Sequence, residues 1–271
     1  MSSGLRRIIN SFNYRVIRPL FHADKRAWST KTDFNKSYRR LVKTLKSSHD
    51  NDDAMKLAVG GEFEGIGIIE RETLIHFGLK KDDYLIDVGC GSGRLARPLS
   101  EYLTGKYLGI DVVPELIDYA RTLVRRPDWR FEVAEGLSIP EEDGQADMVC
   151  FFSVLTHLLH EESYTYLMEA KRVLRPSGKI VFSFLDFSSP SHWPVFEFNL
   201  KDIGVGAHPL NMFMSHDAVR VWASHLGLKI EFIQESEEPF LTLPHPVTLE
   251  SGGVVSGKSV FGQTICVLSR P

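Results

Sequence analysis

Three glycines at alternating positions follow a short apolar run in Leu85-Ile-Asp-Val-Gly-Cys-Gly-Ser-Gly-Arg94. Glycine has no β-carbon, so this segment can turn tightly and let a ligand approach the main chain. Such a ligand would lie at the carboxyl ends of parallel strands, near the point where the strand order reverses. Asp87 precedes the turn and could accept a hydrogen bond from an ammonium group or a bound water. The pattern predicts a cofactor site, although a strand–helix turn without a ligand has similar glycines.

A dinucleotide site is the main alternative for this turn. Its fingerprint is G-x-G-x-x-G, which holds a pyrophosphate at a helix N-terminus. Gly89, Gly91 and Gly93 instead follow G-x-G-x-G, and Arg94 stands where the third glycine of the fingerprint belongs. The pattern weakens the dinucleotide interpretation and leaves it open.

Alternating strands and helices would position this turn. The apolar runs are short, as in buried parallel strands, and the segments between them have helical character. Repeated strand–helix units imply a parallel sheet with right-handed crossovers and helices on both faces. We expect strands over 84–88, 107–110, 129–133, 147–152, 180–185, 228–234 and 259–268, and helices over 34–45, 94–102, 114–124, 161–174 and 216–226.

Local signals mark the ends of several elements. Pro114 suits the first turn of its helix, whereas Pro98 requires an early position or a kink. Ser215 is the expected N-cap of the helix over 216–226, and Gly227 its C-terminal stop. Residues 47–53 are polar and have the composition of a linker. Residues 186–214 are rich in proline, glycine and aromatic side chains, and we expect a structureless, lid-like insertion there. A Pro/Gly-rich loop is expected between the last two strands.

The glycine turn and four later segments resemble, in order, the motifs of class I S-adenosylmethionine-dependent methyltransferases. Any one match is weak, but five at family-like spacing are specific, and the similarity covers about residues 63–268. The matching segments are Asp87-Val-Gly-Cys-Gly-Ser-Gly, Tyr107-Leu-Gly-Ile-Asp111, Val133-Ala-Glu-Gly-Leu-Ser-Ile-Pro140, Ala146-Asp-Met-Val-Cys-Phe-Phe-Ser-Val-Leu-Thr-His-Leu158 and Val173-Leu-Arg-Pro-Ser-Gly-Lys179.

The resemblance implies S-adenosyl-L-methionine as cofactor and a Rossmann-like α/β fold. The sheet would have seven strands in the order 3-2-1-4-5-7-6, with the last strand antiparallel. Asp111 would bind the ribose hydroxyls, since a carboxylate offers two acceptor oxygens to a vicinal diol. Glu135, where many relatives have Asp, would meet the adenine amino group. Alone, the first acid would more often cap a turn and the second be solvated. The implied cofactor residues are Asp87, Gly89, Cys90, Gly91, Asp111, Val112, Glu135, Gly136 and Phe152.

Two histidines are candidate general bases, which a hydroxyl acceptor would need because a neutral oxygen is a poor nucleophile. His157 follows the fourth strand, in the loop that the resemblance places beside the transferred methyl. His208 lies in the irregular segment and could enter the site when that segment closes. Either could instead be structural or merely exposed. Asp186, at the end of the fifth strand, has a favourable position but could simply cap a turn.

Composition limits the remaining functions. Of 271 residues, 43% are hydrophobic and 25% charged, as in an ordinary globular protein, and no run approaches the ~18 apolar residues of a membrane span. Cys90, Cys150 and Cys266 lack metal-ligand spacing and fall in expected core segments, so we expect no metal site and a reduced, cytoplasmic protein. The chain contains no Asn/Asp-Pro-Pro-Tyr/Phe motif and no Pro-Cys nucleophile. A small-molecule acceptor is therefore favoured over nucleic acid.

The N-terminal region carries most of the positive charge. Residues 1–50 contain 12 Lys/Arg and 3 Asp, whereas residues 51–271 contain 20 Lys/Arg and 32 Asp/Glu. Apolar residues recur at helical spacing over 5–20 between arginines, which predicts a basic amphipathic helix. It could pack on the acidic body, contact a membrane surface or target an organelle. We expect a helical extension over 1–53 and a methyltransferase domain over 54–271. A nicotinamide-dependent oxidoreductase and a catalytically inactive cofactor-binding module remain as alternatives.

Overall fold

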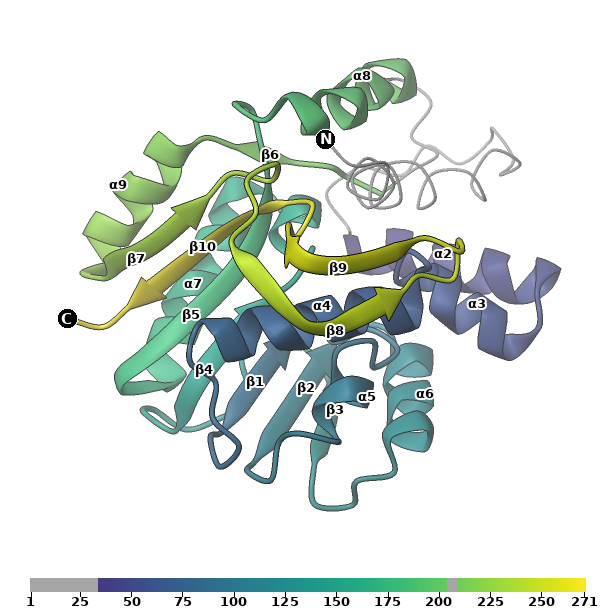
Figure 1. Cartoon of the computed structure of the whole chain (residues 1–271), viewed down its shortest axis with the longest axis horizontal. Coiled ribbons are helices and arrows are strands. Elements are labelled where there is room, and N and C mark those ends of the chain that lie inside the picture. The colour runs from purple at the N-terminus through teal and green to yellow at the C-terminus, as the bar shows by residue number, and fades with distance from the viewer. Residues whose placement is uncertain (1–33, 204–208) are drawn as a thin grey trace.

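The computed structural model describes residues 34–203 and 209–271 (Figure 1). The helix expected over 5–20 and the candidate base His208 lie outside the described residues. Within them, a twisted sheet forms the centre of the molecule and helices cover both of its faces.

The sheet has the order β3-β2-β1-β4-β5-β10-β7. β1, β2, β3, β4 and β5 pair in parallel, whereas β10 runs antiparallel to both β5 and β7. The expected order 3-2-1-4-5-7-6 with an antiparallel last strand is therefore confirmed. The strands are β1 (Leu85–Val88), β2 (Tyr107–Asp111), β3 (Arg130–Val133), β4 (Ala146–Phe151), β5 (Leu174–Asp186), β7 (Lys229–Gln234) and β10 (Thr264–Ser269). A short strand, β6 (Phe213–Met214), pairs with the end of β5.

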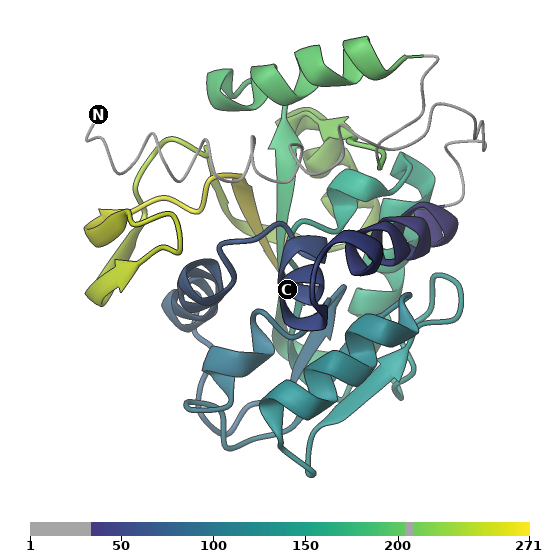
Figure 2. The same ribbon diagram turned by 90° about the vertical axis from the view of Figure 1, so that its right-hand side faces the viewer.

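Two apolar layers hold the helices against the sheet. On one face, buried side chains of α2, α3, α7 and α9 pack together with the inward residues of the strands. On the other face, α4 and α5 pack with one side of α6. Figure 2 shows α2 and α3 beside the sheet and α8 above it. The helices are α2 (Phe34–Ser48), α3 (Asn51–Ala58), α4 (Phe63–His76), α5 (Ala96–Leu99), α6 (Pro114–Val124), α7 (His160–Val173), α8 (Trp193–Asp202) and α9 (His216–Leu226).

Helix ends largely follow the local signals. Pro114 occupies the first turn of α6. The Ser215 side chain accepts a hydrogen bond from the Ala218 N–H, and Gly227 ends α9 in the left-handed conformation at φ 61°. A serine cap followed by a terminal glycine is therefore confirmed for α9.

Two expected boundaries were wrong. The helix after the glycine turn spans only Ala96–Leu99, with Pro98 in its first turn, and hydrogen bonds between residues three apart follow at Glu101 and Tyr102. The polar stretch 47–53 is not a linker: α2 extends to Ser48, and α3 begins at Asn51. Asp50 caps α3 by accepting a hydrogen bond from the Asp53 N–H at 2.9 Å.

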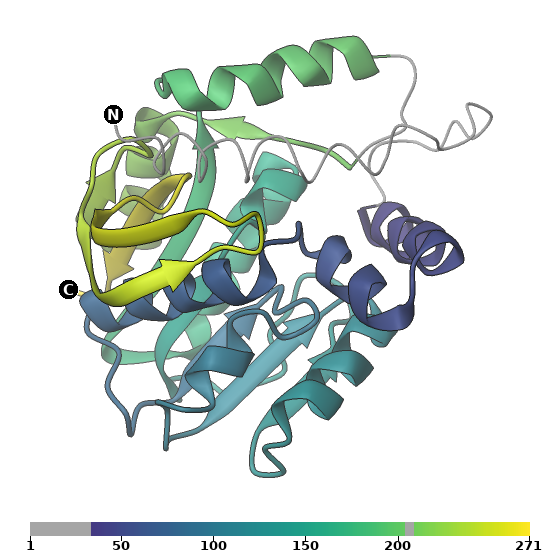
Figure 3. The same ribbon diagram turned by 45° about the vertical axis from the view of Figure 1, so that its right-hand side comes forward.

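Two segments expected to be irregular contain regular structure. Within 186–214, a 3-10 turn (Pro190–His192) leads into α8, so the insertion is not structureless. Between β7 and β10, β8 (Leu241–Thr248) and β9 (Val254–Ser259) form a hairpin rather than a loop. The prolines within β8 hid its alternation of buried and exposed residues. Figure 3 shows this hairpin lying along α4.

No helix of residues 34–203 and 209–271 combines the length and the apolar composition that crossing a bilayer requires.

Candidate functional site

A cavity lies at the carboxyl ends of β1, β2 and β4. Its walls come from α2, from the segment joining α3 to α4, from the glycine turn after β1, and from the loop after β4. Residues that lie near the end of β5, in α8 and just before β10 close another side. This is the edge of the sheet, near the reversal of strand order, where the sequence placed a ligand.

The glycine turn after β1 forms part of the cavity wall. Gly89 and Gly91 have φ angles of 77° and 55°, in the left-handed region that favours glycine. The N–H of Gly89 donates to the Ile110 carbonyl at 2.7 Å, which ties the turn to β2. A β-carbon on Gly89 would lie 2.3 Å from Val154 Cγ2, and one on Gly91 would lie 2.4 Å from Val59 Cγ1. These glycines are therefore required because the side chains of Val154 and Val59 pack against them.

Asp111 ends β2 and faces the cavity. Its Oδ2 accepts the Gly91 N–H at 3.1 Å, and its Oδ1 accepts the Val113 N–H at 2.9 Å. Burial raises the pKa of Asp111 to about 6, although these backbone N–H groups favour the ionised form. Each carboxylate oxygen has two lone-pair directions, so both retain acceptor capacity toward a ligand.

Asp87 and Cys90 lie beneath the cavity and do not contribute to its lining. Asp87 is 2% exposed and accepts hydrogen bonds from the Tyr107 hydroxyl at 2.7 Å and the Cys150 thiol at 3.5 Å. Burial raises its pKa to about 7. Its partners in this structure are therefore protein groups at the base of the turn. Cys90, Cys150 and Cys266 are buried and free of disulfides, as their core positions predicted.

The other expected cofactor residues divide between the wall and the surface. Val112 and Phe152 line the cavity beside Asp111 and the loop after β4, whereas Glu135 and Gly136 are exposed and outside its lining. Ala134, one residue earlier, does reach the wall. The described conformation thus does not bring the Glu135 carboxylate to Asp111.

His157 ends a 3-10 turn (Leu155–His157) and lines the cavity. Its Nδ1 lies 2.7 Å from the Leu210 carbonyl, an acceptor only, so Nδ1 carries the proton and donates it. In the neutral ring this leaves Nε2 as an acceptor. Burial lowers the pKa of His157, which favours that neutral form. The geometry is that of an oriented base.

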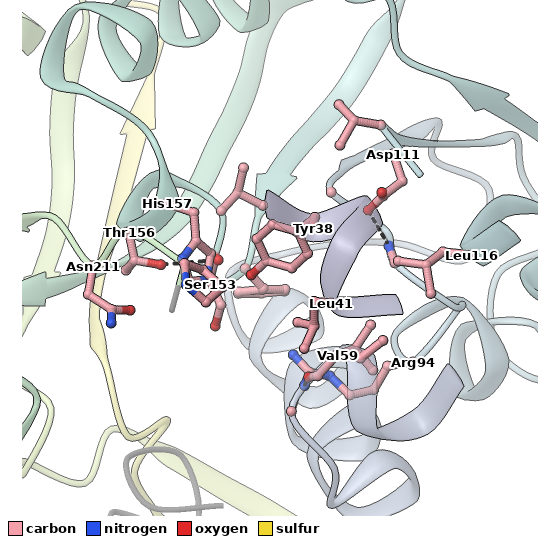
Figure 4. Close-up of a pocket in the computed structure, with 18 of the residues that line it drawn as sticks. Tyr38, Leu41, Val59, Arg94, Asp111, Leu116, Ser153, Thr156, His157 and Asn211 are labelled. Atoms are coloured by element: carbon pink, nitrogen blue, oxygen red, sulfur yellow. Dashed lines mark hydrogen bonds between the residues drawn. The ribbon is translucent and has the colours of Figure 1, made fainter. Parts of the chain in front are cut away.

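Tyr38 is a cavity residue that the sequence did not single out. It comes from α2, and its ring meets the His157 ring edge-on at a centroid distance of 5.2 Å. Figure 4 shows Tyr38 between His157 and Asp111. Tyr38, Leu41 and Leu45 all line the cavity and share one helical face. That spacing was a detectable signal for a buried face, but it carried no information about what the face covers.

Arg94 connects the glycine turn to the segment after α3. Its guanidinium forms an ion pair with Glu70 of α4 at 2.5 Å and donates to the Val59 carbonyl. Glu70 is 2% exposed, and burial raises its pKa although Arg94 opposes that effect. Arg94, which stands where the dinucleotide fingerprint has its third glycine, therefore links two segments of the cavity wall.

The far side of the cavity mixes apolar and polar groups. Leu185, Val195 and Phe198 supply apolar surface, and Asn211 and Gln263 supply amides. Among the described residues, no cluster of His, Cys, Asp and Glu has the arrangement of a metal site. The cavity therefore has one wall formed by the glycine turn and the Asp111 carboxylate, and another wall suited to an organic molecule.

Comparison with known proteins shows that the central segment is similar to methyltransferases. The model of the family described as "Methyltransferase domain" matches residues 86–182. Malonyl-[acyl-carrier protein] O-methyltransferase of Hahella chejuensis is 30% identical over 149 residues, which cover 54% of this chain and 51% of that protein. The chloroplastic 2-phytyl-1,4-beta-naphthoquinone methyltransferase of Arabidopsis thaliana is 35% identical over 119 residues, 41% of this chain and 44% of that protein.

The matches to curated relatives are partial, since the first three cover 45%, 30% and 51% of the relative. Among solved structures, a SAM-dependent methyltransferase of Methanosarcina mazei has a TM-score of 0.53 at 18% identity, and the match covers 73% of this chain and 96% of that one. That likeness shows the fold. The nicotinamide-dependent and inactive-module alternatives gain no support from these comparisons.

Proposed function

We propose that this chain, which contains a class I S-adenosylmethionine-dependent methyltransferase domain, transfers a methyl group from S-adenosylmethionine to a hydroxyl or amine of a small molecule. The observation that carries the proposal is Asp111, a carboxylate held by backbone N–H groups in a cavity that also contains an oriented histidine. A sugar or a lipid-linked intermediate belongs to the same range of acceptors.

The residues present fit the cofactor. Asp111 offers two oxygens to the ribose diol, and the adjacent wall of Val112, Leu116 and Ala134 is apolar, as an adenine ring requires. Gly89 and Gly91 of the left-handed turn line the cavity where the amino-acid end of the ligand would lie. Glu135 is exposed in this structure, so its contact with adenine stays a prediction.

When bound, S-adenosylmethionine supplies a methyl group activated by its attachment to a positively charged sulfur. The protein's task is to hold the acceptor atom in line with that methyl, and positioning of this kind can contribute up to ~7–11 kcal/mol. His157 Nε2 is the acceptor for the proton of a hydroxyl nucleophile, since Nδ1–H is fixed on the Leu210 carbonyl. An uncharged amine would need positioning alone.

The names of several relatives favour oxygen as the methylated atom. Besides the malonyl-[acyl-carrier protein] enzyme, they include a tocopherol O-methyltransferase and a ubiquinone biosynthesis O-methyltransferase. The mixed wall near Asn211 and Gln263 accommodates an organic body with polar substituents. We therefore favour a hydroxyl group on a small, partly apolar molecule.

Calorimetry with S-adenosylmethionine, S-adenosylhomocysteine and NAD tests the cofactor, and a screen of phenolic and carboxylic acceptors tests turnover. We expect binding of both sulfur compounds and none of NAD. Affinity for NAD alone would favour an oxidoreductase. Binding of the sulfur compounds with no methylation of any acceptor would favour the inactive module.

The proposal also covers the cellular compartment, contact with a membrane and the domain boundary. Three free, buried cysteines fit a reducing, cytoplasmic compartment. Contact with a membrane surface through residues 5–20 is tested by liposome sedimentation of chains with and without residues 1–24. The boundary between a helical extension over 1–53 and a methyltransferase domain over 54–271 stays a prediction. Helix α3 (Asn51–Ala58) runs across that boundary.

A further inference from the structure

Gln263 lines the cavity, and a hydrogen bond from a buried serine orients its side chain. It lies just before β10, is 8% exposed and contributes to the cavity wall. Ser183 of β5 is fully buried, and its hydroxyl donates to Gln263 Oε1 at 2.7 Å. The same hydroxyl oxygen accepts the Ser153 N–H at 2.8 Å. β5 and the loop after β4 therefore both orient the glutamine.

In this chain of hydrogen bonds the amide oxygen of Gln263 is the atom that faces Ser183. A hydroxyl has a single hydrogen, and that of Ser183 is donated to Oε1. The amide oxygen is thus engaged with the sheet, and the Nε2 group with its two hydrogens is at the other end. Within residues 34–203 and 209–271, no hydrogen bond joins Gln263 Nε2 to an acceptor. Gln263 Nε2 is not one of the fully buried atoms that lack a partner, so it is accessible from the cavity and can donate to an oxygen of a ligand.

Ser153 supplies a second, independent observation. Its Oγ is buried and has no hydrogen-bond partner among the described residues, yet the residue lines the cavity. Its φ angle is 58°, a left-handed conformation that is strained for serine. The Ser153 N–H on Ser183 and the Ser153 carbonyl, which accepts the Thr156 hydroxyl at 3.1 Å, hold that conformation. Ser153 is thus held in the cavity wall with a buried hydroxyl that has no partner among the described residues.

We propose that Gln263 Nε2, with Ser153 Oγ, binds an oxygen of the methyl acceptor that accepts hydrogen bonds, namely a carbonyl or carboxylate oxygen near the methylated atom. The inference rests on the proposed function and adds the substrate class. The apolar side chains of Phe152 and Leu185, also in the wall, would contact the carbon skeleton of such a molecule. His157 would accept the proton of the acceptor's hydroxyl, and Gln263 would donate a hydrogen bond to the acceptor's second oxygen.

Three probes that share a phenol hydroxyl isolate this second oxygen. Salicylate carries a carboxylate beside the hydroxyl, 2-hydroxyacetophenone a ketone, and 2-ethylphenol a group of similar shape to the ketone without oxygen. Their affinities are measured by saturation-transfer NMR titration, with and without S-adenosylhomocysteine. We expect the wild type to bind at least one oxygen-bearing probe about 10-fold or more tightly than 2-ethylphenol. The tighter of the two identifies the carbonyl or the carboxylate as the source.

Two substitutions test the residue itself. Gln263→Leu removes the donor, whereas Gln263→Glu keeps an acceptor for the Ser183 hydroxyl and loses the donor, so it is informative even if the leucine variant does not fold. We expect both to abolish the preference over 2-ethylphenol while affinity for S-adenosylhomocysteine is retained. Gln234→Leu is the matched control, since that side chain makes an exposed hydrogen bond to Glu238. It should behave as the wild type.

The outcomes separate the two proposals. Equal affinity of the wild type for all three probes, no binding of any probe, or a preference that survives both Gln263 substitutions would overturn the donor site. Failure of the wild type to bind S-adenosylhomocysteine would instead refute the methyltransferase proposal. The probe preference measured without S-adenosylhomocysteine would still show whether Gln263 is a donor.

Discussion

Replacement of Asp111 by asparagine tests the central contact of the cofactor site. The ordinary pKa of 3.8 is raised to about 6 by burial, a difference that corresponds to about 3 kcal/mol of unfavourable burial of the carboxylate at neutral pH. Asparagine keeps one acceptor oxygen and no charge. We therefore expect Asp111→Asn to fold with at least wild-type stability at pH 8. Its affinity for S-adenosylhomocysteine should fall ~10–150-fold, since a hydrogen bond to a charged group contributes about 1.5–3 kcal/mol.

The same pKa predicts how affinity depends on pH. Only the ionised carboxylate accepts both hydroxyls of a diol, and with a pKa of about 6 in the free protein about a tenth of Asp111 is ionised at pH 5. Wild-type affinity should fall about 10-fold from pH 8 to pH 5. Stability behaves oppositely: the contribution of Asp111 is fully present below pH 3.8 and is lost as pH rises through 6.

Calorimetric titrations at pH 5, 6, 7 and 8 measure the affinity, and urea unfolding measures the stability. Asp118→Asn is the control, because that carboxylate is exposed on α6 in a pair with Arg121. Asp87, whose pKa burial raises to about 7, titrates in the same range. Asp87 can therefore leave a residual slope, but a pH slope of affinity as steep in Asp111→Asn as in the wild type, or a loss of affinity smaller than about 3-fold at pH 8, would refute the role given to Asp111.

Three further substitutions test the walls of the cavity. Gly91→Ala places a β-carbon 2.4 Å from a methyl of Val59, at a residue with a φ angle of 55°. It should lower the free energy of unfolding, measured in urea, by ~1–3 kcal/mol. The control Gly144→Ala, whose β-carbon meets open space, should cost less. Arg94→Met leaves the Glu70 carboxylate buried without its partner and should destabilise by ~3–5 kcal/mol, and adding Glu70→Leu should restore part of that; equal stability of single and double variants would contradict the pairing. His157→Ala should lower turnover at least ~10-fold with a hydroxyl acceptor at saturating cofactor, and unchanged steady-state kinetics would remove it from the mechanism.

Much of the fold was predictable because its signals are local. Pro114 at the start of α6, and Ser215 and Gly227 at the ends of α9, act through their own backbone neighbours. The glycine turn likewise depends on φ angles that only glycine adopts readily. The hairpin of β8 and β9 was missed since its prolines resemble a loop, although the alternate residues Leu241 and Leu243 pack on α4.

The cavity required contacts between residues far apart in the chain. Tyr38 lies 119 positions before the His157 ring that it meets. Nothing in the local sequence distinguishes it from any other aromatic residue on an amphipathic helix. The same holds for Ser153, Ser183 and Gln263, which come together because β5 pairs with both β4 and β10.

Sequence by itself determined the alternation of strands and helices, the glycine bend after β1 and the position of Asp111 at the end of β2. These features follow from the order of residue types along one segment. Tertiary structure decided that Asp87 is satisfied beneath the cavity, that Glu135 is exposed, and that α2 forms a wall. The reason is physical: burial and hydrogen-bond partners depend on which distant segments pack together, and that information is not contained in any single stretch of the chain.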